Sequence, residues 1–150
     1  MTNPLLLSSS MFSTIMHYIS FFKYNPKYAL LEYSYIFSLI TSILNHGLSH
    51  ISFKIVDRIV VSTTFFINLY LINKIYKITK NKYIIENAFF IMILATMMFF
   101  LTKFIDIEKD KKIKYIPHAL AHILITITNI ILIKSYSSEI NSKKLKIKSV

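Results

Sequence analysis

The sequence predicts an all-α, multi-pass transmembrane helix bundle with about five spans. Of its 150 residues, 54% are hydrophobic, glycine occurs once and proline three times. This composition is unusual for a water-soluble domain. The charged residues stand in short groups, and the uncharged runs between them have roughly 15 to 22 residues, about what is needed to cross a hydrocarbon core of roughly 30 Å. We therefore expect one membrane-embedded domain.

The spacing of the charged groups places five spans along the chain. A retained helix is favoured over a cleaved signal peptide for the first, serine-rich span, because no basic residue precedes its apolar stretch. Residues 1–133 would form a single transmembrane domain, and the lysine- and serine-rich residues 134–150 would form a disordered basic tail. The expected spans are 4–22, 30–49, 55–72, 83–102 and 115–133.

The basic residues predict a membrane protein rather than a nucleic-acid-binding one. The net charge is +11, but the lysines lie in the short connections and in the tail, where membrane proteins keep charge on their cytoplasmic side. With five spans, eleven basic residues fall on the side of the tail and seven on the other. We therefore expect the N-terminus outside or in a lumen and the C-terminus in the cytoplasm.

Residues 116–122 open the last span with the pair His118 and His122. Two histidines four residues apart lie on one face of a helix, so both imidazoles can reach one ion. His46, near the end of the second span, is expected at the same membrane face. Cysteine is absent, so any metal site must use histidine and carboxylate. Three imidazoles are typical ligands of a catalytic Zn²⁺, which keeps a fourth position for water.

Two further polar residues are expected at that face. Asp57, in the first turn of the third span, could accept a proton from water or orient a ligand. Ser42, one helical turn before His46, could donate a hydrogen bond to a substrate oxygen or orient the site. Ordinary structural roles stay open for both, because a transmembrane serine often bonds a helix carbonyl and Asp57 could pair with Arg58 or Lys54.

Three other ionisable residues are weaker candidates. His50 lies beyond Gly47, so it is expected at the interface rather than as a ligand. His17 is expected to be structural. Glu86 should lie near the opposite membrane face, away from the histidines.

The order Ser42-x-x-x-His46, Asp57, His118-x-x-x-His122 resembles the signature of the alkaline ceramidase and progestin/adipoQ receptor superfamily of membrane hydrolases. The resemblance implies His46, His118 and His122 as zinc ligands, Asp57 as the base and Ser42 as the residue that orients the site. It also implies hydrolysis of an amide bond in a ceramide-like lipid. Members of that family usually have seven helices, whereas this chain has room for about five.

Two alternatives use the same residues differently. In one, the chain is a noncatalytic membrane protein that scaffolds, remodels membranes or acts as a receptor, with a structural cluster of histidines. In the other, His46 and either His118 or His122 bind a haem from opposite sides. The expected partners are membrane lipids and a lipid substrate, and a homo-oligomer would be one way to complete the core of so short a chain.

Overall fold

The predicted helical fold is confirmed by a computed structural model, which describes residues 3–26, 29–48, 50–104 and 111–148. Within these ranges the chain forms helices joined by short connections and contains no strand. The predicted mixed-charge connection before the last span falls mainly on residues 105–110, outside the described residues. The helices are α1 (Pro4–Tyr24), α2 (Ala29–Leu48), α3 (Ile51–Ile78), α4 (Lys82–Phe104) and α5 (Lys111–Lys148).

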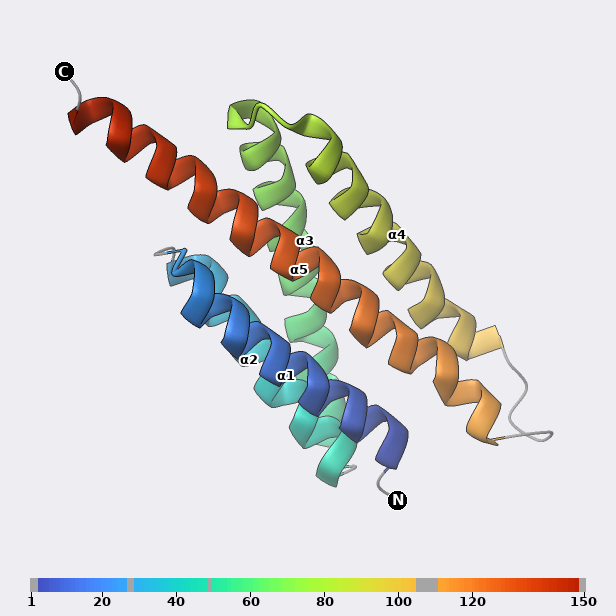
Figure 1. Cartoon of the computed structure of the whole chain (residues 1–150). Helices are drawn as coiled ribbons and strands as arrows, with labels where there is room; N and C mark the ends of the chain where they lie inside the picture. Colours follow the sequence, from blue (N-terminus) through green and yellow to red (C-terminus); the bar gives the residue numbers. More distant parts are fainter. Residues whose placement is uncertain (1–2, 27–28, 49, 105–110, 149–150) are drawn as a thin grey trace.

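Helix α5 is the central element of the bundle. In Figure 1 it runs diagonally across the molecule, with α4 on one side and the neighbouring helices α1 and α2 on the other, while α3 lies behind it. The N-terminus and the C-terminus lie at opposite ends of the bundle (Figure 1). The end of α2, the start of α3 and the start of α5 lie at the end that carries the N-terminus, so the residues expected to form one site come from one end of the bundle.

The ends of α1 follow from local chemistry. The side chain of Asn3 accepts a hydrogen bond from the backbone N–H of Leu6 at 3.2 Å, and Pro4 occupies the first helical position, where no N–H is needed. Asn25 adopts a left-handed conformation with φ of 40°, which asparagine tolerates, and Pro26 follows it. Helix α1 therefore ends at Tyr24, two residues beyond the span expected at 4–22.

Four of the described helices, α1, α3, α4 and α5, contain a stretch long and apolar enough to cross a membrane. Helix α2 is not among them, because Glu32 near its start and Asn45 and His46 near its end lower its hydropathy. The chain thus has the features of a multi-pass membrane protein. The span predicted at 30–49 is helical, and its crossing of the bilayer stays a prediction.

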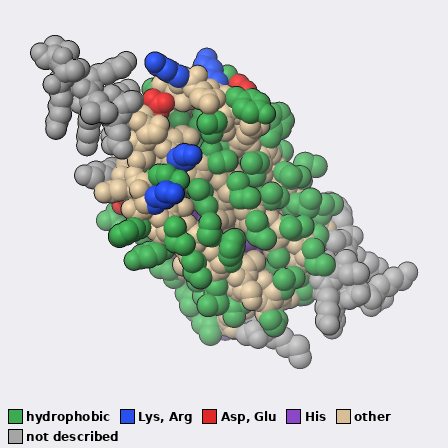
Figure 2. All heavy atoms as spheres, in the orientation of Figure 1, with side chains coloured by type: hydrophobic (Ala, Val, Ile, Leu, Met, Phe, Trp, Pro, Cys, Tyr) green, Lys and Arg blue, Asp and Glu red, His purple; other side chains and the backbone are tan. Residues whose placement is uncertain are grey.

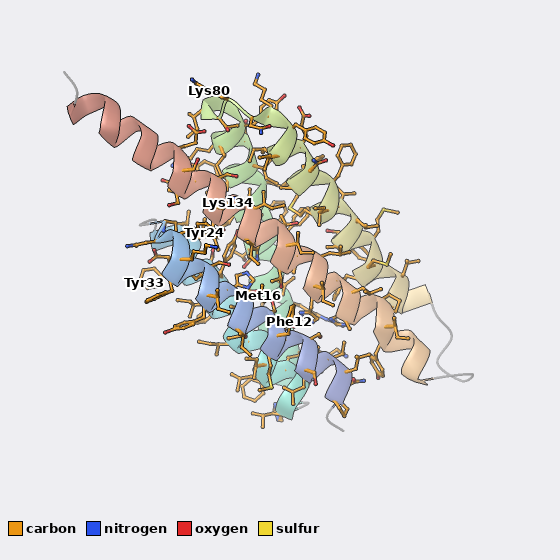
Figure 3. The ribbon with its side chains drawn as sticks, in the orientation of Figure 1. Phe12, Met16, Tyr24, Tyr33, Lys80 and Lys134 are labelled. Carbon is orange, nitrogen blue, oxygen red and sulfur yellow. The ribbon has the colours of Figure 1, made fainter. Side chains whose placement is uncertain are left out.

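The outer surface of the bundle is apolar. Phe22 and Phe90 are 84% and 70% exposed, which lipid tolerates and water does not. Figure 2 shows hydrophobic side chains over most of the visible face, with basic groups gathered toward one end. Lys80 lies at that end, at the turn between α3 and α4 and opposite the N-terminus (Figure 3).

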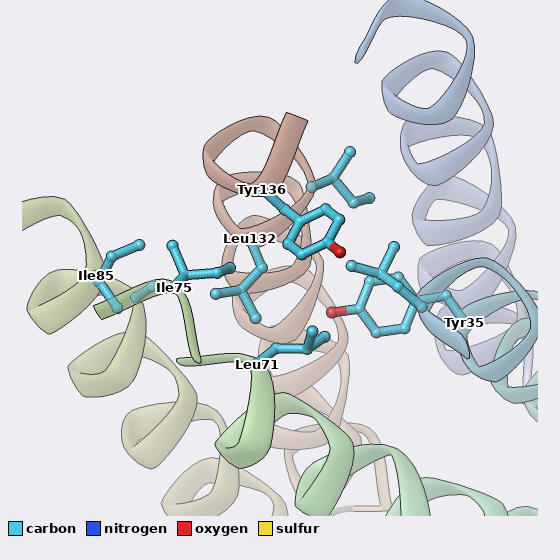
Figure 4. Packing of buried hydrophobic residues seen from close by; sticks show 9 residues of the cluster. Tyr35, Leu71, Ile75, Ile85, Leu132 and Tyr136 are labelled. Carbon is cyan, nitrogen blue, oxygen red and sulfur yellow. The ribbon is translucent and has the colours of Figure 1, made fainter. Parts of the chain in front are cut away.

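A hydrophobic cluster joins α2, α3, α4 and α5 (Figure 4). Side chains from four helices meet here, and most of them are fully buried. Such interdigitation fixes how the helices pack where no hydrophobic effect drives their association within lipid. The cluster contains Leu31, Tyr35, Leu71, Ile75, Ile85, Ala88, Leu132, Ile133 and Tyr136.

The prediction of a disordered tail from residue 134 was wrong, because α5 continues to Lys148. Tyr136 and Ser137 are buried, and the hydroxyl of Ser137 donates a hydrogen bond to the carbonyl oxygen of Tyr24. After Pro117 the sequence has no proline or glycine to end the helix. The packed domain therefore extends beyond residue 133, through at least Ser137.

A chain of buried hydrogen bonds crosses four helices in the interior. The Tyr35 hydroxyl donates to Asn68 Oδ1 at 2.6 Å, and Asn68 Nδ2 donates to Asn129 Oδ1 at 2.9 Å. Asn129 Nδ2 lies 3.0 Å from His17 Nε2, whose ring Nδ1 lies 2.7 Å from the carbonyl oxygen of Ser13. His17 therefore carries its proton on Nδ1 and accepts at Nε2. This supports the expected structural role of His17.

Replacing Asn68 should destabilise the bundle. Asn68→Ala leaves the Tyr35 hydroxyl and the Asn129 carbonyl without their buried partner, at a cost of about 1 kcal/mol in a membrane protein. The change in the free energy of unfolding is measured by titration with a denaturing detergent, with the loss of helix monitored by circular dichroism. Asn73→Ala is the matched control, because Asn73 is an exposed asparagine on the same helix. Equal stability of the two variants would show that the chain of hydrogen bonds contributes nothing.

Candidate metal centre

Three histidines from two helices meet at one end of the bundle. His46 is in the last turn of α2, and His118 and His122 follow one another on one face of α5. One ligand atom from each lies within 4.8 Å of the others. This is the histidine set that the sequence predicted, and it could hold a metal ion. Among the described residues no other histidine or carboxylate belongs to the group.

The ring geometry suits a shared ion. His118 and His122 are stacked, with centroids 5.0 Å apart and an interplanar angle of 7°. His46 meets both rings edge-on, at centroid distances of 5.2 and 5.3 Å. His46 Nε2 and His122 Nε2 lie 3.3 Å apart, close to the separation of about 3.3 Å expected for two nitrogens bound to one tetrahedral Zn²⁺ at 2.0–2.1 Å. The three imidazole donors could therefore hold a metal ion.

The same distance argues against one form of the haem alternative, the one in which His46 and His122 are the two ligands. The two Nε2 atoms of His46 and His122 are in direct contact at 3.3 Å, so no porphyrin plane can pass between them. These two histidines cannot be the axial ligands on opposite sides of a haem in this arrangement.

Asp57 lies close to this end of the bundle but outside the metal-binding group. Its side chain is buried, with 8% exposed. Asn45 Nδ2 donates to Asp57 Oδ2 at 2.8 Å. The Thr41 hydroxyl lies 3.4 Å from Oδ1 and shares its one proton between Oδ1 and the nearer carbonyl oxygen of Ser38, at 3.1 Å. Each carboxylate oxygen thus has one recorded donor and retains a further lone pair that can accept a proton. The hydrogen bonds of Asp57 come from these neutral donors of α2, and the charge of Arg58, one of the two expected partners, also acts on its carboxylate.

Ser42 is buried on α2 and contacts α1. Its Oγ lies 3.0 Å from Oγ of Ser10, whose own hydroxyl donates to the carbonyl oxygen of Leu6 at 2.9 Å. Since Ser10 has one proton to give, Ser42 is the donor of the bond between them. The lone pairs of Ser42 remain able to accept a hydrogen bond. The prediction that Ser42 donates to a substrate would require this bond to break.

A cavity of about 480 Å³ connects these groups, a volume in the range of small-molecule sites. Ser42, Asp57, His118 and His122 line it at the end that carries the N-terminus. Phe66 of α3 and Phe100 of α4 also line it and are exposed. The cavity therefore opens on the outside of the bundle between α3 and α4, the side that lipid would cover.

Sequence reasoning did not identify the second polar part of this cavity. Tyr35, Asn68 and Asn129 line it together with His17. Two asparagines within apolar spans could have indicated it, because a buried amide in a membrane helix needs a hydrogen-bond partner on another helix. The weaker candidates have other positions: His50 is exposed and caps α3 by accepting from Ser52 N at 3.3 Å, and Glu86 is exposed and accepts a hydrogen bond from Tyr76.

Comparison of the chain with family profiles, with curated proteins and with solved structures found no match. The resemblance to the alkaline ceramidase and progestin/adipoQ receptor superfamily therefore depends on five residues, and the structure brings the three predicted histidine ligands together.

Purified protein should bind one Zn²⁺ per chain, and the binding should depend on each of the three histidines. His122→Ala removes one of three nitrogen donors and should weaken binding by more than about 100-fold, beyond the effect usual for residues that only support a ligand. Competition with a chromogenic chelator measures the affinity, and elemental analysis measures the stoichiometry. His50→Ala is the control, because His50 is a histidine outside the group. A zinc affinity of His122→Ala equal to that of wild type would refute the proposed ligand set.

Proposed function

We propose that the protein is a membrane-embedded, zinc-dependent hydrolase that cleaves an amide bond in a lipid. The observation that supports this most is the convergence of His46, His118 and His122, because His118 and His122 line a cavity that Asp57 also lines. Polar and ionisable groups placed inside a membrane protein are costly, and they commonly mark a functional site.

Zinc is proposed because of the donor set. Three neutral imidazoles without a thiolate are the ligands of many catalytic zinc sites, in which a fourth position stays open. When bound, zinc would supply a Lewis acid that polarises a carbonyl group and makes water a stronger acid. Proton transfer and orientation of the reacting groups are assigned to side chains of the protein.

Asp57 is the proposed general base. Asn45 and Thr41 hold its carboxylate in place, and its free lone pairs can accept a proton from the attacking water. The water oxygen forms a bond to the amide carbon, the carbon–nitrogen bond breaks, and the proton passes to the leaving amine. The products are a fatty acid and an amine. Ser42 is the proposed orienting residue, from its place on the cavity wall.

A lipid substrate is proposed from the character of the cavity walls. Phe65, Phe66, Phe99, Phe100 and Ile125 line the cavity, and apolar walls of this kind suit an acyl chain. The opening between α3 and α4 lets a lipid enter from the bilayer without crossing water. In the orientation that the basic residues predict, the histidines lie near the outer or lumenal face.

A second candidate function is a noncatalytic metal-binding membrane protein. It is favoured by the hydrogen bonds of Asp57 to Asn45 and Thr41 and of Ser42 to Ser10, which give both residues a structural partner. In that case the zinc site would stabilise the junction of α2 and α5, and no lipid would be cleaved.

Asp57→Asn should strongly slow hydrolysis while leaving zinc bound. The amide keeps the size of the carboxylate but cannot accept the proton, and loss of a general base lowers the rate by about 10² to 10⁴-fold. Release of sphingoid base from ceramide in detergent micelles measures the activity, and zinc content is measured in the same samples.

Glu86→Gln is the matched control, because it neutralises an exposed carboxylate on α4 that hydrogen-bonds to Tyr76. It should leave hydrolysis unchanged. If zinc-loaded wild-type protein releases no amine, the noncatalytic function is preferred. If Asp57→Asn hydrolyses as fast as wild type, Asp57 is not the base.

A further inference from the structure

Arg58 is the one arginine in the chain, and all the other basic residues among the 18 Lys and Arg are lysines. It follows Asp57 on α3 and lines the same cavity, together with His118 and His122. An exposed cation therefore faces the space in which the proposed substrate would bind. The proposed chemistry gives this guanidinium no role.

Within the described part of the chain, the charge of Arg58 acts on the adjacent Asp57 carboxylate, but no hydrogen bond joins the two side chains. The neighbouring carboxylate of Asp57 takes its recorded hydrogen bonds from Asn45 and Thr41 instead. Lys54, which is also exposed, lies four residues earlier and therefore on the same face of α3. Two like charges one turn apart repel each other, and a bound anion would relieve the part of that repulsion that the neighbouring Asp57 carboxylate does not offset.

The position of Arg58 suits a lipid headgroup. Helix α3 begins at Ile51, so Arg58 lies about 10 Å along the axis from the helix start. A long arginine side chain at that depth can extend toward the headgroup layer while its apolar stem stays in the hydrocarbon. The planar guanidinium has five N–H donors in a fork that matches a phosphate, which the single ammonium of lysine does not.

We propose that Arg58 binds the phosphate group of the lipid substrate, so that the substrate is a phosphate-bearing amide lipid rather than neutral ceramide. The proposal rests on the proposed function for the identity of the cavity as the substrate site. In this arrangement the phosphate binds Arg58 at the cavity mouth, the amide lies near the histidines and the acyl chain extends along the apolar walls.

Ceramide 1-phosphate and ceramide are suitable probes, because they share the same amide and acyl chain and differ by the phosphate. Binding of each lipid to zinc-loaded protein in detergent is measured by native mass spectrometry, where no bulk bilayer is present to satisfy Arg58. Wild-type protein should bind ceramide 1-phosphate about tenfold or more tightly than ceramide, as expected for a charge-assisted hydrogen bond. Released amine is measured in the same samples.

Arg58→Gln should remove the preference for ceramide 1-phosphate, and Arg58→Lys should keep only part of it. Lys80→Gln is the matched control, because it removes one positive charge at the other end of the bundle, and it should keep the full preference. Equal binding of the two lipids by wild type, or an undiminished preference in Arg58→Gln, would overturn the proposal.

Inorganic phosphate is tested alone and as a competitor. Weak competition at millimolar concentration supports a lipid headgroup as the source of the phosphate. Binding of inorganic phosphate as tight as that of ceramide 1-phosphate, and equally dependent on Arg58, would overturn the assignment to a lipid. An Arg58-dependent preference without any released amine would support the phosphate site while refuting the proposed hydrolase.

Discussion

Lipid offers no hydrogen-bond partners, so each polar side chain inside the bundle must be satisfied by another part of the protein. Among the described residues, no buried side-chain nitrogen or oxygen lacks a partner. Serines and threonines mostly bond carbonyl oxygens of their own helix, as Ser20 does with Met16. The amides of Asn68 and Asn129 instead bond across helices. This requirement determines which faces of the helices can meet.

The same requirement separates the two groups of histidines. Both ring nitrogens of His17 are used, one by the Ser13 carbonyl and one by Asn129, which leaves none for a metal. His46 and His122 instead direct their Nε2 atoms at each other across 3.3 Å. The two nitrogens could share a proton in a hydrogen bond, or both could bind one metal ion. His118 brings a third donor to the same point, which favours the ion.

The cavity is lined both by His118 and His122 and by the buried hydrogen-bonded residues Asn68 and Asn129. It is the space in which the proposed reaction would take place. Its end near the histidines is lined by Ser42 of α2 and Asp57 of α3, and by His118 and His122 of α5. Its walls between α3 and α4 are largely aromatic, and they open where lipid would lie. The proposed substrate would place its apolar tail along these walls, its amide near the histidines and its anionic headgroup at Arg58.

The sequence by itself determined the helices and the three histidines that could hold a metal ion. Charge grouping placed all five helices, and the four-residue spacing of His118 and His122 put both on one face, because these are local properties of helix geometry. Counting spans brought His46 to the same end. The sequence could not show that Asn45 and Thr41 hold Asp57, that Tyr136 extends the core past residue 133, or that Asn68 and Asn129 pair. These contacts join residues far apart in the chain, and only the packing of the helices decides which side chains meet. The cavity, and the place of Arg58 on its wall, were decided by the tertiary structure for the same reason.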